Sequence, residues 1–234
     1  MSFTDPRLEV KRHTKQIPWT YRELDSLQRE IQTGILSGES GRLLLSEVAP
    51  VITLGRRTQP GDILGTPEYF NQHQVEIYPT DRGGLATYHG PGQWLLFPVE
   101  SLEKLTGDPR GVKQAVESLL EVACEVGRQY DSSAHIRTGC EQGVWTTRGK
   151  FAAVGVHIGG GVLLHGVSVN GFRTPTSFVG LRPCGLDAPV DYLLGEASEA
   201  EFVRLGELLA GEMLKRMDFA LRSRTPLNQT QNLL

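Results

Sequence analysis

Hydrophobic residues recur at helical spacing in three stretches of the chain, which predicts three helices. Thr20-Tyr21-Arg22-Glu23 has the form of a capping box and places the start of the first helix. Asp108-Pro109 predicts the start of the second, because Asp is a good N-cap and Pro suits the first helical position. The third covers 198–221. The positions expected to face the core are Leu24, Leu27, Ile31 and Ile35, then Val112, Val116, Leu119, Ala123 and Val126, then Phe202, Leu205, Leu209 and Met213.

Shorter hydrophobic runs predict strands. In one of them Val75 and Ile77 alternate with polar residues and are expected to face inward. The last three strands are separated by Arg148-Gly149 and by Gly159-Gly160-Gly161, which are turn sequences, so they predict a β-meander. Helices and runs of strands mix without a regular βαβ alternation. This indicates an α+β fold with a central mixed or mostly antiparallel sheet flanked by helices. The predicted strands are 42–48, 51–54, 73–78, 94–97, 144–147, 151–158 and 162–169.

Composition narrows the class of protein. The chain has 234 residues, enough for one domain with a real core, which we expect over 1–221, followed by a polar tail over 222–234. The formal net charge of −3 does not suggest a nucleic-acid partner. No apolar run approaches the ~20 residues of a membrane span, and 1–15 lack the apolar centre of a secretory signal. Three scattered cysteines predict neither a disulfide framework nor a zinc site. We therefore expect a cytoplasmic protein without a metal.

One stretch, 81–98, concentrates polar residues between glycines. Four glycines fall within ten residues, and an apolar run over 94–97 follows them. Glycine lets the backbone turn tightly and lets a ligand lie against bare main chain. The stretch is either a glycine-rich connection between two strands or part of a binding site. The polar residues that favour a binding site are Arg82, Thr87, Tyr88, His89 and Gln93.

The three cysteines differ in their surroundings. Cys124 lies next to the apolar face of the second predicted helix and is expected to be a core residue. Cys140 is followed by Glu141, whose negative charge disfavours a thiolate. Cys184 lies in Pro183-Cys184-Gly185 with Arg182 nearby, so it is the best candidate nucleophile, since the thiolate is the attacking form. A lone loop cysteine is, however, more often incidental.

Four motifs together resemble the lipoyl(octanoyl) transferase family. Arg82-Gly83-Gly84 is followed by Thr87-Tyr88-His89-Gly90-Pro91-Gly92-Gln93. Gly143-Val144-Trp145 precedes Lys150-Phe151-Ala152-Ala153-Val154-Gly155-Val156. Next come His165-Gly166-Val167-Ser168-Val169-Asn170 and Pro183-Cys184-Gly185. These motifs occur in the family's order and span close to half of the chain.

The resemblance implies a fold and a site. The fold would be similar to the catalytic domains of biotin and lipoate ligases. Cys184 would accept the acyl group and Lys150 would activate it, although a lysine after Arg-Gly is otherwise a solvated hairpin residue. His89 and His165 are rival bases or structural histidines. Glycines at 83, 84, 155 and 166 would leave room for an acyl chain. The implied substrate-binding residues are Arg82, Gly83, Gly84, Leu85, Ala86, Thr87, Tyr88, His89, Ala153, Val154, Gly155, Gly166, Val167 and Ser168.

The implied reaction takes an octanoyl group from octanoyl-acyl carrier protein onto Cys184. It then passes the group to a lysine on a lipoyl domain of a 2-oxo-acid dehydrogenase complex or on the glycine-cleavage H protein, the first step of endogenous protein lipoylation. No cofactor is required, because the thioester donor is already activated and the product amide is more stable. The alternatives are an ATP-dependent lipoate-protein ligase on the same fold and a non-catalytic binder of acylated carrier protein. A basic rim for the acidic carrier is expected from Arg56, Arg57, Arg148, Arg173 and Arg182.

Overall fold

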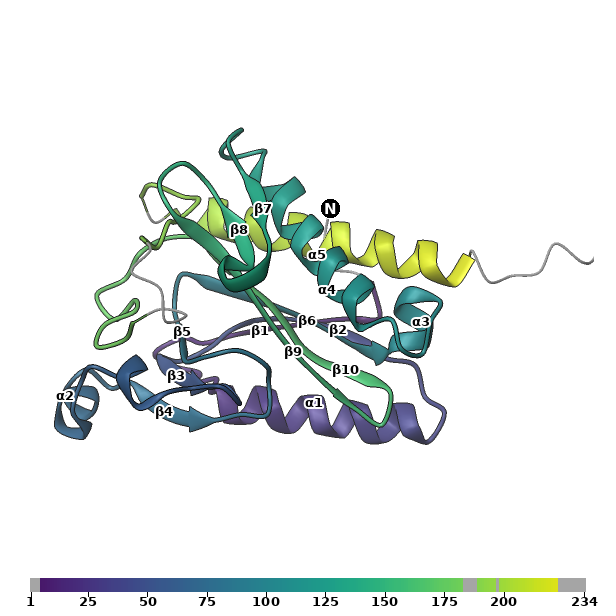
Figure 1. The fold of residues 1–234 in the computed structure, drawn as a ribbon, viewed down its shortest axis with the longest axis horizontal. Helices are drawn as coiled ribbons and strands as arrows, with labels where there is room; N and C mark the ends of the chain where they lie inside the picture. The colour runs from purple at the N-terminus through teal and green to yellow at the C-terminus, as the bar shows by residue number, and fades with distance from the viewer. Residues whose placement is uncertain (1–4, 183–188, 197, 223–234) are drawn as a thin grey trace, which may run out of the picture.

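The computed structural model describes residues 5–182, 189–196 and 198–222. Within these ranges the strands form two sheets, drawn in Figure 1 with the helices around them. The elements are β1 (Leu8–Arg12), α1 (Tyr21–Leu36), β2 (Arg42–Glu47), β3 (Val51–Leu54), η1 (Pro60–Asp62), α2 (Pro67–Gln72), β4 (Glu76–Pro79), β5 (Thr87–His89), β6 (Gln93–Ser101), α3 (Leu102–Thr106), α4 (Val112–Gly127), β7 (His135–Arg137), η2 (Gly139–Glu141), β8 (Gly143–Trp145), β9 (Lys150–Gly159), β10 (Val162–Asn170) and α5 (Glu199–Arg222).

The larger sheet has seven strands in the order β1-β2-β6-β10-β9-β8-β7, among the residues that the structure describes. Only β1 and β2 pair in parallel, and each of the other neighbours is antiparallel. The smaller sheet has the order β4-β3-β5, with β3 parallel to β4 and antiparallel to β5. The predicted α+β class, the mostly antiparallel sheet and the β8-β9-β10 meander are confirmed.

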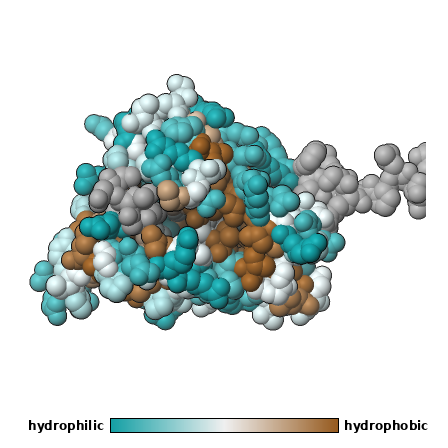
Figure 2. All heavy atoms as spheres, in the orientation of Figure 1, coloured by the Kyte–Doolittle hydropathy of each residue, from teal (hydrophilic) through white to brown (hydrophobic). Residues whose placement is uncertain are grey.

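Helices cover both faces of the larger sheet. Figure 1 shows α1 along one face and α3, α4 and α5 across the other. Successive strand residues point to opposite faces, so Leu44 packs toward α1 with Tyr21 and Leu24, while Leu43 and Leu45 pack toward α4 and α5. All three leucines of β2 are therefore buried. Hydrophobic residues also gather along the β9–β10 hairpin on the face shown in Figure 2.

The first and last predicted helices are confirmed. The Thr20 hydroxyl accepts a hydrogen bond from the Glu23 amide at 3.3 Å, and the Glu23 carboxylate accepts one from the Thr20 amide at 2.7 Å, which completes the capping box. In α5 the four predicted core residues are buried. None of the helices within the described ranges is both long enough and apolar enough to cross a bilayer.

The second predicted helix begins later than the sequence suggested. Gly111, not Asp108, is the N-cap of α4, and Val112 is 37% exposed instead of facing the core. The Asp108 carboxylate accepts a hydrogen bond from the Arg110 amide at 2.8 Å, so it stabilises the turn after α3. Asp closes a local turn as readily as it caps a helix, which is why the prediction failed.

The strand predicted over 73–78 was also wrong in its bounds. His73 caps the C-terminus of α2, whose start is marked by Thr66 as N-cap and Pro67. The strand β4 begins at Glu76 and forms an edge of the smaller sheet. Val75 is buried as expected, but Ile77 is 37% exposed because an edge strand is covered less completely. The sequence analysis also missed the short elements β1, η1, α2, β5, α3, β7 and η2.

Candidate functional site

A pocket of about 740 Å³ lies between the glycine-rich segment, α1 and the β9–β10 hairpin. Its volume falls in the range of small-molecule sites, roughly 300–1,000 Å³. Three of the four sequence motifs, far apart along the chain, contribute to its walls. The residues around it are Tyr21, Arg57, Gln59, Arg82, Gly84, Leu85, Thr87, His89, Phe97, Gly139, Cys140, Gln142, Lys150, Ala153, Val154, Gly155, His165, Gly166 and Ser168.

Ten of the fourteen predicted substrate-binding residues border this pocket. The other four do not, because they face other parts of the structure. Val167 points into the core on the opposite face from Gly166 and Ser168, as the alternation of a strand requires. Ala86 and Tyr88 pack into the core of the smaller sheet. Gly83 donates its amide to the Val156 carbonyl at 2.9 Å and so ties the glycine-rich segment to β9.

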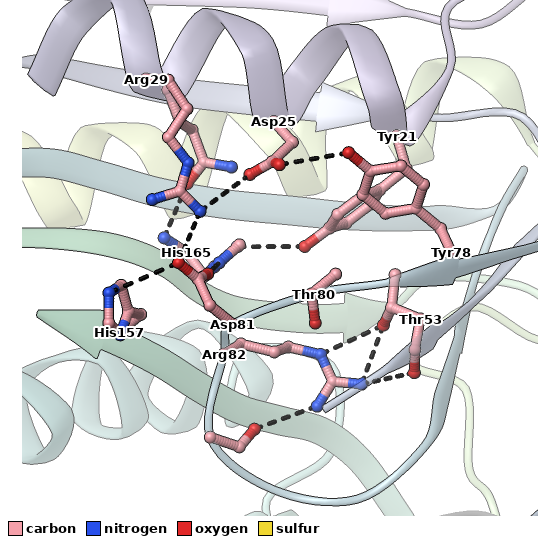
Figure 3. A network of polar contacts seen from close by, with 12 residues as sticks. Tyr21, Asp25, Arg29, Thr53, Tyr78, Thr80, Asp81, Arg82, His157 and His165 are labelled. Atoms are coloured by element: carbon pink, nitrogen blue, oxygen red, sulfur yellow. Dashed lines mark hydrogen bonds and ion pairs between the residues drawn. The ribbon is translucent and has the colours of Figure 1, made fainter. Parts of the chain in front are cut away.

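Arg82 anchors the glycine-rich segment on the side of the smaller sheet. Its Nε donates to the Thr53 hydroxyl at 3.1 Å and its Nη2 donates to the Thr53 carbonyl at 2.7 Å (Figure 3). Further backbone bonds join Arg56 to the Arg82 carbonyl and Arg57 to the Gly84 carbonyl, each at 3.0 Å. Arg82 is only 6% exposed. It therefore holds the pocket wall in place as well as bordering the pocket.

Asp81 turns the opposite way and anchors the same segment to α1 and the larger sheet. Its carboxylate accepts from His165 Nε2 at 2.8 Å and from Arg29 Nη2 at 2.8 Å, and His157 Nε2 lies 3.4 Å away (Figure 3). The hydrogen bond from His165, with the contribution of Arg29, holds the pKa of Asp81 well below its ordinary value. Asp81 is therefore ionised at neutral pH and keeps a proton on His165 Nε2.

His165 has an unusual backbone within β10. Its φ is +60°, a left-handed conformation that costs a non-glycine residue roughly 1–3 kcal/mol. The His165 amide donates to the Gln28 side chain of α1 at 2.7 Å, so this group is satisfied. The Tyr21 hydroxyl lies 3.1 Å from His165 Nδ1. The two ring nitrogens of His165 are therefore both engaged, Nε2 by Asp81 and Nδ1 by the Tyr21 hydroxyl.

His89 belongs to a second chain of hydrogen bonds. Its Nδ1 lies 2.6 Å from Gln93 Oε1, and Gln93 Nε2 donates to Asn170 Oδ1 at 2.8 Å. Since the amide nitrogen of Gln93 is used by Asn170, its oxygen must accept from His89. Burial, with a contribution from the positive charge of Arg82, lowers the pKa of His89 to about 3. His89 is thus neutral and a weak base, which favours the structural role over the catalytic one.

Lys150 opens β9 at the more exposed end of the pocket. Its Nζ donates to the Gln142 carbonyl at 2.7 Å and lies 5.8 Å from the centre of the Trp145 ring. The Lys150 amide donates to the Pro189 carbonyl, and its carbonyl accepts from the Asp191 amide, each at 2.9 Å. The chain that follows the Pro-Cys-Gly motif is therefore paired with the strand end that carries Lys150. Cys184 itself lies outside the described residues.

The two described cysteines occupy different environments. Cys124 is 2% exposed and its thiol donates to the Ala134 carbonyl at 3.5 Å, so the expected core position is confirmed. Burial raises the pKa of the Cys124 thiol. Cys140 is exposed, is a free thiol in η2 and borders the pocket, which no sequence motif indicated. Among the residues that the structure describes, Cys140 is therefore the alternative candidate nucleophile to Cys184.

Main chain crowds two glycines of the motifs, Gly166 severely and Gly155 slightly. A Cβ at Gly166 would lie 2.2 Å from the Leu96 carbonyl oxygen, and a Cβ at Gly155 would lie 3.1 Å from the Gly83 carbonyl oxygen. The expectation that these glycines leave room for a ligand is therefore only part of the explanation. Both border the pocket, but a side chain at position 166 would overlap neighbouring main chain and one at position 155 would crowd it.

Strand register separates Lys150 from His165 along the pocket. His165 pairs with Val156 and Val169 pairs with Ala152 on β9. Lys150 is six residues from Val156, which corresponds to about 20 Å at ~3.3 Å per strand residue. Lys150 and His165 therefore lie at opposite ends of the site and cannot act on the same atom of a small ligand.

Over the described part of the chain, no group of three or more His, Cys, Asp or Glu residues is arranged to hold a metal ion.

Comparison with known proteins gives consistent matches. Residues 21–200 match the family of the lipoyl protein ligase A/B catalytic domain. The octanoyltransferase of Alkaliphilus metalliredigens is 38% identical over 147 residues, covering 62% of this chain and 65% of that protein. The octanoyltransferase of Magnetococcus marinus is 35% identical over 182 residues, covering 77% of this chain and 80% of that protein.

The fold is also shared with a solved structure. The structure of a bipartite lipoate protein ligase and its E2 lipoyl domain from Thermoplasma acidophilum contains a chain that superimposes with a TM-score of 0.61 at 13% identity. The match covers 91% of this chain and 90% of that one. At this identity the likeness concerns the fold alone, and it confirms the α+β architecture of lipoate ligases that the motifs implied.

Proposed function

Because this chain belongs to the lipoyl protein ligase A/B catalytic-domain family and is similar to octanoyltransferases, we propose that it is an octanoyltransferase. It takes an octanoyl group from octanoyl-acyl carrier protein onto Cys184 and passes it to a lysine of a lipoyl domain. The acceptors are the lipoyl domains of 2-oxo-acid dehydrogenase complexes and the glycine-cleavage H protein. Residues 1–221 form the catalytic domain, and the reaction takes place in the cytoplasm.

The observation that carries this proposal is the convergence of three motifs on one pocket. The glycine-rich segment, the strand that begins with Lys150 and the strand that contains Gly166 all border it. The fourth motif holds Cys184, and the chain after it hydrogen-bonds to both sides of the Lys150 backbone. A lysine ammonium near the cysteine would favour the thiolate, since a free Cys has a pKa of ~8.5.

The proposed chemistry proceeds in two steps. The Cys184 thiolate attacks the octanoyl thioester, a new carbon–sulfur bond forms, and the carrier thiolate leaves and takes up a proton. The neutral amine of the acceptor lysine then attacks the enzyme thioester, the amide forms, and the Cys184 thiolate leaves. Lys150, which has given up its proton once its anionic partner is acylated, takes the proton lost by the amine. Each step conserves charge and requires no nucleotide.

The pocket suits a saturated acyl chain. Its walls combine hydrophobic side chains with exposed main chain, and burying each methylene contributes ~0.8 kcal/mol. Phe97, Leu85 and Val154 supply apolar surface to the pocket wall. Polar groups of the wall are largely paired within the protein, as for Arg82, His89 and His165. An alkyl chain can therefore fill the pocket without leaving many polar groups of the wall unpaired.

Transfer without ATP distinguishes this proposal from its rivals. The protein is mixed with octanoyl-acyl carrier protein and an apo lipoyl domain, and the intact mass of the lipoyl domain is followed. Octanoylation in the absence of any nucleotide supports the octanoyltransferase. Modification that occurs only with ATP and a free acid would show a lipoate ligase, and binding of the carrier without modification would show a non-catalytic binder.

A further inference from the structure

Three aromatic rings close the buried end of the pocket. Tyr21 stacks almost parallel to His89, with ring centres 5.4 Å apart and planes at 8°, and to His165, at 6.4 Å and 13°. Phe97 packs edge-on against His165 at 5.8 Å. Tyr21, His89 and His165 are at most 4% exposed, and all three border the pocket. We refer to His89, Tyr21 and His165 as the ring stack.

Residues behind the ring stack hold each ring in position. Gln93 accepts from His89, and Asp81 accepts from His165. The Tyr21 hydroxyl is joined to His165, as Figure 3 shows. Asp81 does not border the pocket, and its side chain is 31% exposed. The ring stack thus separates the pocket from the polar network that reaches solvent at Asp81, and each of its rings is held by a hydrogen bond.

The ring stack lies at the end of the pocket away from Lys150. His165 pairs with Val156, about 20 Å along β9 from Lys150 at ~3.3 Å per residue. If the thioester is formed beside Lys150, the acyl chain runs along β9 and its methyl end approaches the ring stack. We infer that the ring stack is the end wall of the acyl pocket and sets the longest linear acyl chain that the protein accepts.

This inference rests on the proposed function, because it takes the Lys150 end as the carbonyl end. Tyr21 is the residue whose loss should matter most, since it is the middle ring and comes from α1, outside the strands that carry the other walls. Leu24 provides a matched control. It lies one turn further along α1 in the same core cluster, is fully buried and does not border the pocket.

The test measures calorimetric binding of free linear carboxylic acids from hexanoic to octadecanoic acid, in steps of two carbons, to the full chain and its variants. The series extends this far because an extended dodecanoic acid is shorter than the separation of Lys150 and His165 along β9. In the wild type, affinity should rise about fourfold for each added methylene, the equivalent of ~0.8 kcal/mol, until the chain reaches the ring stack, and then stop rising. In Tyr21→Ala the rise should continue for at least two more methylenes, a gain of roughly 16-fold for the longer acid over wild type. Tyr21→Phe and Leu24→Ala should keep the wild-type limit.

A folded Tyr21→Ala protein whose affinity stops rising at the wild-type chain length would overturn the inference that the ring stack is the end wall. An equal shift of this chain length in Leu24→Ala would overturn it as well. If Tyr21→Ala does not fold, Tyr21→Leu keeps a hydrophobic side chain on α1 and is expected to extend the limit by at least one methylene; an unchanged limit overturns the inference. Mass spectrometry of the protein mixed with octanoyl-acyl carrier protein distinguishes a failure of the end-wall inference from a failure of the proposed function. An acyl adduct on Cys184 with an unmoved limit leaves the proposed function intact, whereas failure to bind or take up any acyl chain removes both.

Discussion

Gly143 leaves the space that the side chain of Lys150 occupies. A Cβ at position 143 would lie 2.3 Å from Cε and 3.0 Å from Nζ of Lys150, closer than real Cβ contacts. The same Cβ would lie 2.5 Å from the Ala152 carbonyl oxygen. The glycine of the Gly-Val-Trp motif therefore positions the lysine of the next motif, and the two motifs form one structural unit.

Gly143→Ala should displace the Lys150 ammonium from the Gln142 carbonyl. We expect at least a tenfold fall in the rate of acyl transfer and a loss of stability of about 1–3 kcal/mol, since the main chain at Ala152 must shift as well. Transfer kinetics and thermal unfolding measure the two effects. Gly61→Ala is the control, because a Cβ there meets no atom within 4 Å. If Gly143→Ala transfers the acyl group as fast as wild type, the position of the Lys150 ammonium does not matter for transfer.

Lys150 is expected to activate Cys184. Lys150→Ala should raise the pKa of the Cys184 thiol and slow transfer most severely near neutral pH, because less thiolate is present. Lys150→Arg should keep the thiolate but transfer slowly to the amine, since guanidinium cannot act as a base and its planar fork fits poorly. The rate of iodoacetamide labelling of Cys184 against pH measures the thiolate directly.

Superimposable labelling profiles for wild type and both variants would remove Lys150 from this role. The register of β9 and β10 argues against His165 as its replacement, because His165 lies at the other end of the pocket. The low pKa of His89 argues against His89.

His89 should make the protein sensitive to mild acid. The pKa of His89 is about 3 in the folded protein and near 6.5 in the unfolded chain, so the unfolded state binds the proton first as pH falls. The free energy of unfolding should therefore decrease by up to ~1.4 kcal/mol per pH unit from this residue below pH 6.5, until pH reaches about 3. Urea unfolding between pH 7.5 and 4.5 tests this. His89→Asn keeps a donor near Gln93 and should flatten the slope, whereas an unchanged slope would show that His89 is already charged.

The expected basic rim is reduced by ion pairs. Arg148 contacts Asp131 at 2.7 Å and Asp191 at 3.0 Å, so its charge is largely compensated. Arg57 is exposed and borders the pocket. Arg57→Ala should weaken affinity for octanoyl-acyl carrier protein severalfold at low salt and by less at high salt, because ions screen surface charges.

Arg110→Ala is the matched control for carrier binding. Arg110 is also exposed but does not border the pocket, so its loss should leave carrier affinity unchanged although the net charge changes equally. Equal effects of the two variants, or an affinity that does not depend on salt, would mean that the carrier docks without Arg57.

The parts of the fold that the sequence predicted are those with local causes. The capping box at Thr20 and the turn glycines between β9 and β10 act through neighbouring residues, so their elements could be placed closely. Asp108 failed because a turn and a helix cap compete for the same carboxylate. The edge position of β4, and with it the exposure of Ile77, depends on strand pairing that no local pattern encodes.

The sequence predicted the site residues that lie within the motifs and missed those that lie outside them. Ten of the predicted substrate-binding residues border the pocket, as do Lys150 and His165, yet Tyr21 enters it from the first helix and Cys140 from a 3-10 turn. Nothing in the spacing of Tyr21 distinguishes it from an ordinary core residue of an amphipathic helix. Similarly, the joining of Asp81 to His165 requires the glycine-rich segment and β10 to be adjacent, which is a property of the whole sheet.

The acyl adduct on the protein tests the central claim most directly. Wild type and cysteine variants are mixed with octanoyl-acyl carrier protein without ATP, and the adduct is located by intact-mass and peptide mass spectrometry. We expect a single octanoyl group on Cys184 in wild type, Cys124→Ala and Cys140→Ala, and none in Cys184→Ala. An adduct that persists in Cys184→Ala, or one that maps to Cys140 at the edge of the pocket, would contradict the account.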